Sequence, residues 1–137
     1  MSVKEAKQGV KFDEFKLRWD LLPIRALFEV VKVYTIGCIK YADRNWEKGI
    51  SWCRMFAALQ RHAWAWFLGQ ETDPKDGQKH MASVVWIGLG LLEFDFTHPE
   101  LDDRPKLSDS EATAFLETIN KFIEDYANSR AKVSTSV

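Results

Sequence analysis

The chain has 137 residues, of which 46% are hydrophobic and 28% are charged, and its formal net charge at pH 7 is −1. This balance is typical of one folded domain and excludes an intrinsically disordered chain, which would carry fewer apolar residues and more net charge. The small net charge also excludes a global attraction to nucleic acid or to an anionic membrane. We therefore expect neither as a partner, and we expect any anionic ligand to be held by a local site.

The cysteine and aromatic contents suggest a compartment and a surface. Cys38 and Cys53 form no CxxC motif, and neither a secretory signal nor an apolar run of about 18 residues accompanies them, so we expect a cytoplasmic protein. Six tryptophans and nine phenylalanines exceed the usual needs of a small core. Aromatic residues also supply oligomer interfaces and surfaces that stack on bases, so the excess indicates one of these.

The N-terminal part of the chain predicts an arm and a first helix. Residues 1–22 mix charged and aromatic residues without a helical period, which predicts an extended arm. Pro23 is suited to the start of a helix, and apolar residues then recur at helical spacing, so we predict a helix over 23–42. The predicted buried face of this helix consists of Ile24, Leu27, Phe28, Val31, Tyr34 and Cys38.

Two further helices are predicted in the middle of the chain. Ser51 is placed to cap a helix that ends near Leu68, and the Gly-, Pro- and acid-containing loop 69–77 follows as an ordered turn. Residues 78–96 are apolar nearly all round and contain Gly88 and Gly90, which predicts the most buried helix, closely approached by its neighbours.

The C-terminal part predicts a connector, a helix and a tail. Residues 97–107 form the connector, and Ser108 followed by Glu111 is a capping box that opens a helix over 108–130. Residues 131–137 are expected to fray. The whole chain is thus predicted to be a single all-α domain resembling a four-helix bundle, with its helical core at 23–96 and an N-terminal arm.

Acidic residues are the first candidates for chemistry. Glu29 on the first helix and Glu71, Asp73 and Asp76 in the loop offer the oxygen ligands that Mg²⁺ and Mn²⁺ prefer. Alternatively, Glu29 belongs to a solvated face with neighbouring basic residues, and the loop is an ordinary solvated turn.

Histidines, cations and one aromatic side chain form a second set of candidates. His62 and His80 could each be a metal ligand, a phosphate donor or a general base, or else a structural hydrogen-bonding group. Arg61 either neutralises phosphate or covers apolar surface with its stem. Trp46, beside Asn45, either stacks on a purine base or closes the end of the bundle.

A set of short motifs, in order along residues 11–93, resembles a known family. The motifs are Lys11-Phe12-Asp13, Lys16-Leu17-Arg18-Trp19-Asp20-Leu21-Leu22-Pro23, Gly37, Lys40-Tyr41, Asn45-Trp46, Gly49, Arg61-His62, Ala65-Trp66, Gly69, Asp73, Gly77, His80 and Leu91-Leu92-Glu93. They resemble the phage dATP/dGTP diphosphohydrolase domain, which is related to the MazG-like all-α nucleoside triphosphate pyrophosphohydrolases. Within these, the resemblance is greatest to the MazZ type of phages whose DNA carries 2-aminoadenine in place of adenine.

The resemblance implies hydrolysis of a purine deoxynucleoside triphosphate, dGTP first and GTP as an alternative, to the monophosphate and pyrophosphate. It also implies roughly one to three Mg²⁺ or Mn²⁺ ions, a homodimer or homotetramer, and a phage protein in the bacterial cytoplasm. The dGMP produced would supply synthesis of the 2-aminoadenine nucleotide. MazG-like enzymes typically carry ExxE on one helix and ExxD on another, and this sequence has neither in clean form, since Glu29 is followed at the third position by Lys32 and His80 by Ser83.

The hypothesis for the site combines these residues. We predict Glu29, Glu71 and Asp73 as metal ligands and Glu29, Asp73 and His80 as the catalytic residues. The predicted substrate-binding residues are Lys16, Arg18, Trp19, Lys40, Asn45, Trp46, Arg61 and His62. Two alternatives remain, a housekeeping pyrophosphohydrolase of broad specificity and a non-catalytic phage module that binds a nucleotide or a protein.

Overall fold

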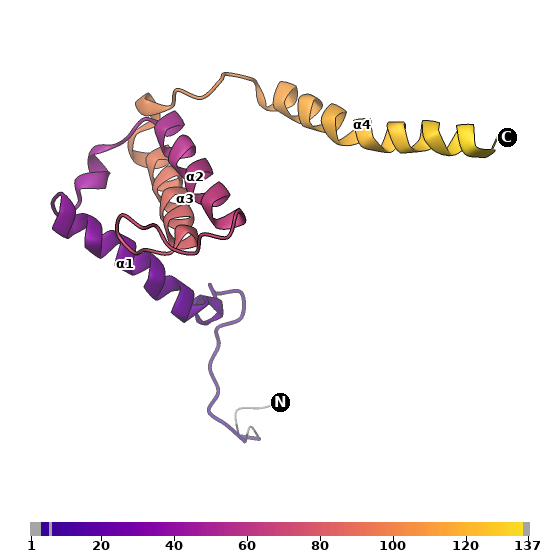
Figure 1. Ribbon diagram of the computed structural model, residues 1–137. Helices are drawn as coiled ribbons and strands as arrows, with labels where there is room; N and C mark the ends of the chain where they lie inside the picture. The colour runs from indigo at the N-terminus through magenta and orange to yellow at the C-terminus, as the bar shows by residue number, and fades with distance from the viewer. Residues whose placement is uncertain (1–3, 6, 136–137) are drawn as a thin grey trace. The chain divides into compact units, whose positions relative to one another are not determined.

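A computed structural model describes residues 4–5 and 7–135 and shows two compact units that divide after Leu101. The first unit contains helices α1 (Ile24–Lys40), α2 (Trp52–Phe67) and α3 (His80–Thr97), and the second contains α4 (Asp109–Thr135) (Figure 1). Within the described residues the structure has no strand, only an isolated antiparallel bridge between Thr72 and Lys79. The predicted all-α fold class is confirmed.

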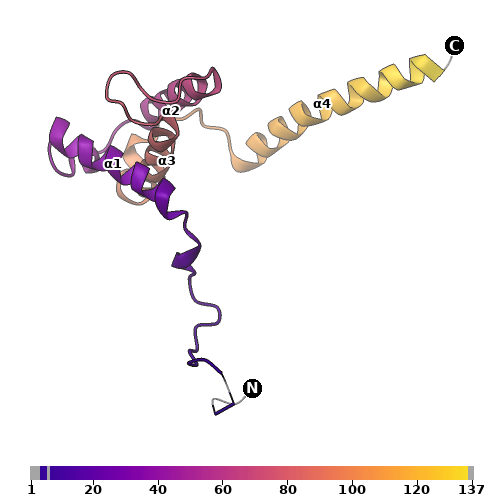
Figure 2. The same cartoon turned by 60° about the horizontal axis from the view of Figure 1, so that its bottom comes forward.

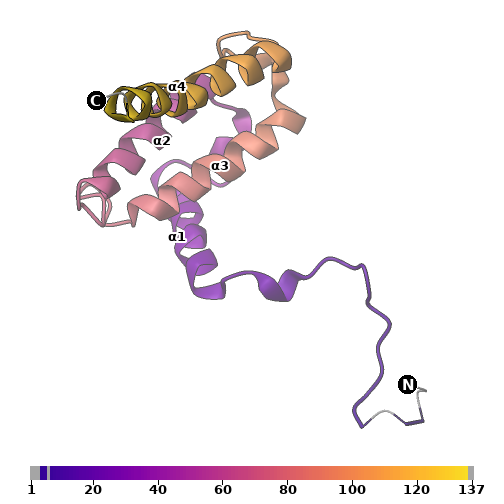
Figure 3. The ribbon, with the colours of Figure 1, turned by 90° about the vertical axis from the view of Figure 1, so that its right-hand side faces the viewer.

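Helix α3 is the centre of the first unit. It packs against both α1 and α2, and Figure 3 shows α2 and α3 lying side by side with the loop between them at one end. Figure 2 gives a second view of how α1 runs past α3. The core cluster consists of Trp52, Met55, Ile87 and Phe94. Six buried residues belong to α3, which confirms that it is the most buried helix.

Gly90 explains the close packing of α2 and α3. A Cβ atom built on Gly90 would lie 2.9 Å from Met55 Cε, so the absence of a side chain lets α2 approach α3. A Cβ on Gly88 would meet nothing within 4 Å. The close approach predicted for both glycines therefore occurs at Gly90 only.

The helix boundaries follow local capping. Ser51 Oγ accepts a hydrogen bond from Arg54 N and caps α2, as predicted. Helix α3 begins at His80 rather than at residue 78, because Asp73 N donates to Gln78 O and Lys79 pairs with Thr72 in the preceding hairpin. Helix α1 is shorter than the predicted 23–42 and ends at Lys40.

The predicted buried face of α1 is wrong at four of its six residues, while Leu27 and Tyr34 are partly buried. Val30 is the buried residue of this helix, whereas Phe28 and Val31 are 61% and 49% exposed, and Ile24 and Cys38 are exposed as well. Apolar residues occupy almost every side of α1, so their spacing fits several faces. Packing against α3 selects one of them, and an apolar face remains exposed.

The arm has little regular structure. Between residues 7 and 22 the chain forms one short 3-10 turn, Trp19–Leu21, and the side chains are exposed. Residues 1–3 and 6 of the predicted arm lie outside the described residues.

The second unit is dominated by one long helix. Ser108 Oγ accepts a hydrogen bond from Glu111 N, and Glu111 Oε2 accepts one from Ser108 N, which confirms the capping box. Helix α4 continues to Thr135, past the predicted end at 130, because Ala131 and Lys132 favour helix and Ser134 Oγ donates to Ala131 O. Residues 136 and 137 of the predicted tail lie outside the described residues.

Candidate functional site

The loop between α2 and α3 is an ordered hairpin that positions Asp73. Asp73 O accepts a hydrogen bond from Gly77 N at 2.7 Å, and Asp73 Oδ1 accepts one from Lys75 N at 2.9 Å. Gly77 has φ +72°, a conformation that glycine adopts without strain. The predicted ordered turn is thus present, and its own backbone fixes the Asp73 carboxylate.

Two histidines meet beside this loop. His62 lies in the last turns of α2 and His80 is the first residue of α3, and their Nδ1 atoms are 2.8 Å apart. His80 Nε2 lies 2.8 Å from Gln70 Oε1. His80 is 4% exposed and its backbone N donates to Glu71 O, so the loop holds both its ring and its backbone.

These contacts define the protonation of the two rings. Gln70 Oε1 can only accept, so His80 Nε2 carries a proton, and the Nδ1 atom of a neutral His80 is left with a lone pair. His62 Nδ1 is then the donor in the hydrogen bond to His80. Burial, and next the neighbouring His80, lower the pKa of His62, although Asp73 and Asp76 oppose this.

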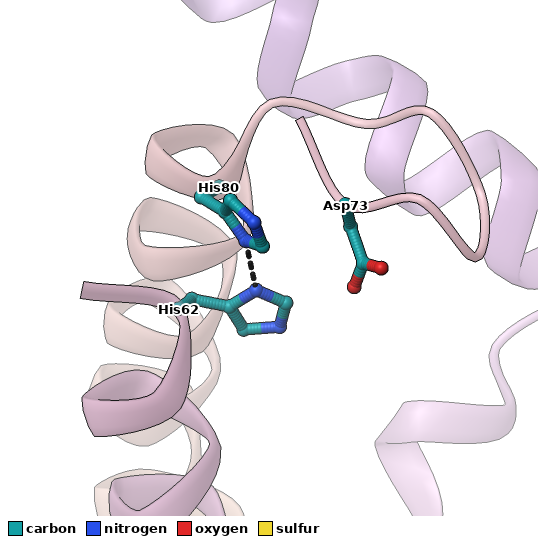
Figure 4. Close-up of side chains that lie close together, drawn as sticks. All are labelled: His62, Asp73 and His80. Atoms are coloured by element: carbon teal, nitrogen blue, oxygen red, sulfur yellow. Dashed lines mark hydrogen bonds between the residues drawn. The ribbon is translucent and has the colours of Figure 1, made fainter. Parts of the chain in front are cut away.

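His62, Asp73 and His80 form a candidate metal group. One ligand atom from each residue lies within 4.8 Å of those of the other two, and Figure 4 shows the three side chains converging from α2, the loop and α3. Within the described part of the chain it is the only such group of three or more histidine, cysteine or acidic residues.

A pocket of about 370 Å³ lies next to this group, in the size range of small-molecule sites. His62 and Asp73 are among the residues that line it. Its basic and aromatic lining residues are Lys40, Arg44, Lys75, Tyr34, Tyr41, Trp46 and Trp86. Cations and flat aromatic surfaces near a carboxylate suit a ligand that carries both phosphate and a base.

Several lining residues are held by neighbours. Arg44 forms an ion pair with Glu47 at 2.6 Å, and Lys40 Nζ lies 5.5 Å from the centre of the Tyr41 ring. Trp46 packs edge-on against Tyr34 and also borders the core cluster. Trp46 therefore packs against the core and lines the pocket at the same time.

The structure brings together some of the predicted site residues. Lys40, Asn45, Trp46, His62 and Asp73 line the pocket, and His80 lies behind His62.

Other predicted residues lie elsewhere. Glu29 forms an ion pair with Lys32 Nζ at 2.8 Å on α1 and neither lines the pocket nor joins the histidine group. The Glu71 side chain is exposed, and Arg61 is exposed beside His62. The roles predicted for Glu29 and Glu71 in metal binding stay predictions.

The arm residues also lie outside the pocket lining. Arg18 forms an ion pair with Asp20 at 2.6 Å, and Trp19 is 74% exposed. Lys16 is exposed. The structure does not bring these three residues to the site.

Sequence reasoning did not assign Gln70, Tyr34 or Lys75 to the site, although Tyr34 and Lys75 line the pocket and Gln70 contacts His80. Lys75 follows Asp73-Pro74 in the turn, so the proximity of a cation to the carboxylate could have been read from the loop itself. Gln70 carries no such signal, because only the packing of the loop on α3 brings its amide to His80.

The fold and site define an all-α domain with a small-molecule pocket beside a candidate metal group. The family described as dATP/dGTP diphosphohydrolase, N-terminal, matches residues 6–104, and the chain belongs to this family. The dATP/dGTP diphosphohydrolase of Salmonella phage PMBT28 is 30% identical over 96 residues, which are 70% of this chain and 33% of that protein. The chain thus spans about a third of the length of this relative.

No solved structure matches the chain significantly. None of the helices in the described ranges combines the length and apolarity needed to cross a bilayer.

Proposed function

We propose that this chain hydrolyses a purine deoxynucleoside triphosphate, dGTP first and GTP as an alternative, to the monophosphate and pyrophosphate. Water supplies the oxygen that joins the α-phosphorus, and the bond from this phosphorus to the bridging oxygen of the β-phosphate breaks. Membership of the family and the name of the phage relative support this activity.

The observation that supports the proposal is a pocket whose lining combines candidate metal ligands with basic side chains. Its lining includes His62 and Asp73 of the histidine group together with the cations Lys40, Arg44 and Lys75. Charge-assisted contacts from lysine and arginine bind phosphate oxygens strongly where water is partly excluded. The pocket therefore suits a triphosphate whose α-phosphate, where the bond breaks, lies beside the histidine group.

The remaining lining residues suit the nucleoside. Trp46 and Tyr41 offer aromatic surface for a purine, and the Asn45 amide offers both a donor and an acceptor for the edge of the base. Discrimination between guanine and adenine would then depend on the hydrogen bonds made at this edge.

The His62, Asp73 and His80 side chains would hold a divalent metal, and the predicted ions are Mg²⁺ and Mn²⁺. Two imidazole nitrogens and a carboxylate oxygen that lie within 4.8 Å of one another can together ligate a divalent ion, of which Mn²⁺ accepts imidazole more readily than Mg²⁺ does. When bound, a divalent ion neutralises phosphate charge and lowers the pKa of a water molecule.

The test is hydrolysis of separate nucleotides by the purified chain in Mn²⁺ and in chelator, with products identified by chromatography. We expect dGMP and pyrophosphate from dGTP, and a loss of turnover of at least about 100-fold in Asp73→Asn. Asp95→Asn is the matched control, because Asp95 is an exposed carboxylate of α3 outside the pocket lining. Unchanged turnover in Asp73→Asn would remove Asp73 from the site.

The same panel separates the alternatives. Equal turnover of dGTP, GTP, dATP and dCTP would indicate a housekeeping enzyme of broad specificity. Absence of both binding and hydrolysis would indicate a non-catalytic module. Selective production of dGMP would support a role in supplying 2-aminoadenine nucleotide synthesis in the cytoplasm of a phage-infected cell.

We also propose a homo-oligomer, a dimer or a tetramer. The apolar stripe of α4 supports this, because Phe115, Leu116, Ile119, Phe122, Ile123 and Tyr126 are each about half exposed or more. Sedimentation should show self-association that Ile119→Ser with Phe122→Ser abolishes, whereas Lys121→Ser with Glu124→Ser leaves it intact. A wild-type protein that sediments as a monomer would contradict the proposal.

A further inference from the structure

The donor atoms of the candidate metal group are mostly nitrogen. Of the three side chains, His62 and His80 contribute imidazoles and Asp73 alone contributes oxygen. Mg²⁺ prefers a shell of oxygen atoms and binds imidazole weakly, whereas first-row transition-metal ions gain affinity from imidazole in the order Mn²⁺, Fe²⁺, Co²⁺. The set of side chains thus distinguishes between ions that have the same charge.

Gln70 fixes which nitrogen of His80 is available. Its Oε1 atom lies 2.8 Å from His80 Nε2, so this nitrogen carries the proton and Nδ1 presents its lone pair toward His62. A histidine that ligates a metal characteristically donates its other N–H to an oxygen acceptor in this way, which fixes the ring and its tautomer. Gln70 supplies this acceptor before any ion binds.

The hydrogen bond between the two histidines is a second sign of a shared site. The Nδ1 atoms are 2.8 Å apart, and one proton between them satisfies both. A cation and this proton compete for the same lone pair on His80 Nδ1. The 4% exposure of His80 leaves little room for water to substitute for either.

We propose that His62, Asp73 and His80, with Gln70 as the positioning residue, form a site selective for a first-row transition-metal dication over Mg²⁺. The inference rests on the proposed function, because it identifies the class of ion at the same site. Mg²⁺, although abundant, therefore binds this site more weakly than the transition-metal ions do. Gln70 sets the affinity of the site for the ion without contacting the ion.

The test uses Co²⁺ alone with the full chain, without nucleotide, and follows visible absorption of the bound ion. We expect the spectrum of an imidazole-ligated Co²⁺ and an affinity for Co²⁺ at least about tenfold higher than for Mg²⁺, measured by competition. His62→Gln and His80→Gln should each abolish this spectrum. His98→Gln is the matched control, because His98 is the third histidine of the chain and lies outside the group.

Gln70 variants test the positioning role. Gln70→Leu removes the acceptor and should weaken Co²⁺ binding by about 10- to 100-fold, whereas Gln70→Glu keeps an acceptor and should retain or strengthen it. Circular dichroism of each variant shows whether the helices persist. Equal affinities of the Leu and Glu variants would exclude a positioning role.

Failure of this inference is distinguishable from failure of the proposed function. A Co²⁺ spectrum that persists in both His62→Gln and His80→Gln, or Mg²⁺ that competes on equal terms, overturns the ion selectivity even if dGTP is hydrolysed. Histidine-dependent Co²⁺ binding without hydrolysis of any nucleotide would uphold the site and overturn the proposed activity.

Discussion

Helices α3 and α4 are both rich in apolar residues, but only α3 buries them. Helix α3 contributes six buried residues to the first unit, among them Phe94, which is fully buried. Helix α4 is longer, and none of its side chains that the structure describes is buried. An isolated helix is marginally stable in water. The stability of the long α4 therefore depends on its capping box and on a partner surface that covers its apolar stripe. The contrast shows that the first unit has its own core, whereas the second unit does not.

The site follows the same division. Every residue that lines the pocket and every residue of the histidine group belongs to the first unit. The tryptophans at 19, 46, 52, 64, 66 and 86 also all precede Leu101. Tryptophan fluorescence therefore reports on the first unit alone and allows the two units to be tested separately.

The largest expected effect is at the centre of the core. Phe94→Ala removes a fully buried ring and should lower the free energy of unfolding by about 3–5 kcal/mol in urea titrations followed by fluorescence. Phe96→Ala on the same helix is the control, because Phe96 is 83% exposed and its loss should change stability by less than about 0.5 kcal/mol. Similar losses for both variants would show that the core is not centred on Phe94.

A smaller effect is expected at Gly49, before α2. Gly49 has φ +94°, and a Cβ there would lie 2.5 Å from Leu101 Cδ1 and 3.0 Å from the His98 ring. Gly49→Ala should therefore cost about 1–3 kcal/mol of unfolding free energy. Gly88→Ala, in the interior of α3 with nothing within 4 Å, should instead stabilise by up to about 1 kcal/mol. An opposite order of the two would contradict the backbone described here.

A pH-dependent effect is expected at His98, which joins the end of α3 to the turn before α2. Its Nδ1 lies 2.8 Å from Glu100 Oε1 and its Nε2 lies 2.7 Å from Glu47 O, and the bond to Glu100, then that to Glu47, raise the pKa of His98. A raised pKa means stabilisation that is fully present below the ordinary value near 6.5 and is lost as the pH rises through the folded-state value.

The measurement compares the wild type with His98→Gln. The difference in their midpoints of thermal unfolding should be largest at acidic pH and should shrink above the raised pKa. A difference that grows with pH would mean that neutral rather than protonated His98 makes these contacts.

The smallest expected effect is that of the α4 stripe on the first unit. Ile119→Ser with Phe122→Ser should change the unfolding seen by tryptophan fluorescence by less than about 0.5 kcal/mol at protein concentrations where the chain is monomeric. A loss greater than about 1 kcal/mol would show that the stability of the first unit depends on α4 and that the two units are not independent.

The local elements of the fold could be predicted from the sequence because their signals are local. Ser51 and the Ser108–Glu111 pair specify helix starts through hydrogen bonds to residues three positions away. The apolar composition of α3 identified the buried helix, and the Gly and Asp residues of the loop identified the ordered turn.

The choice of helix face and the makeup of the site depended on tertiary structure. Helix α1 has apolar residues on several faces, so the spacing of these residues does not identify the buried face. Contact with α3 determines that Val30 is buried. In the site, the sequence indicated Asp73, His62 and His80 separately but grouped Asp73 with Glu29 and Glu71. Residues 62 and 80 lie 18 positions apart, and their Nδ1 atoms meet only because α2 and α3 pack side by side.

The sequence alone therefore determined the all-α class, the helix starts, the ordered loop and the identity of the chemical groups, since each depends on residues close together in the chain. Only the tertiary structure decided which groups share a site, because ligation and hydrogen bonding need atoms within a few ångströms, and those distances are set by helix packing. Gln70 illustrates the limit, since its contact with His80 exists only through the fold of the loop onto α3.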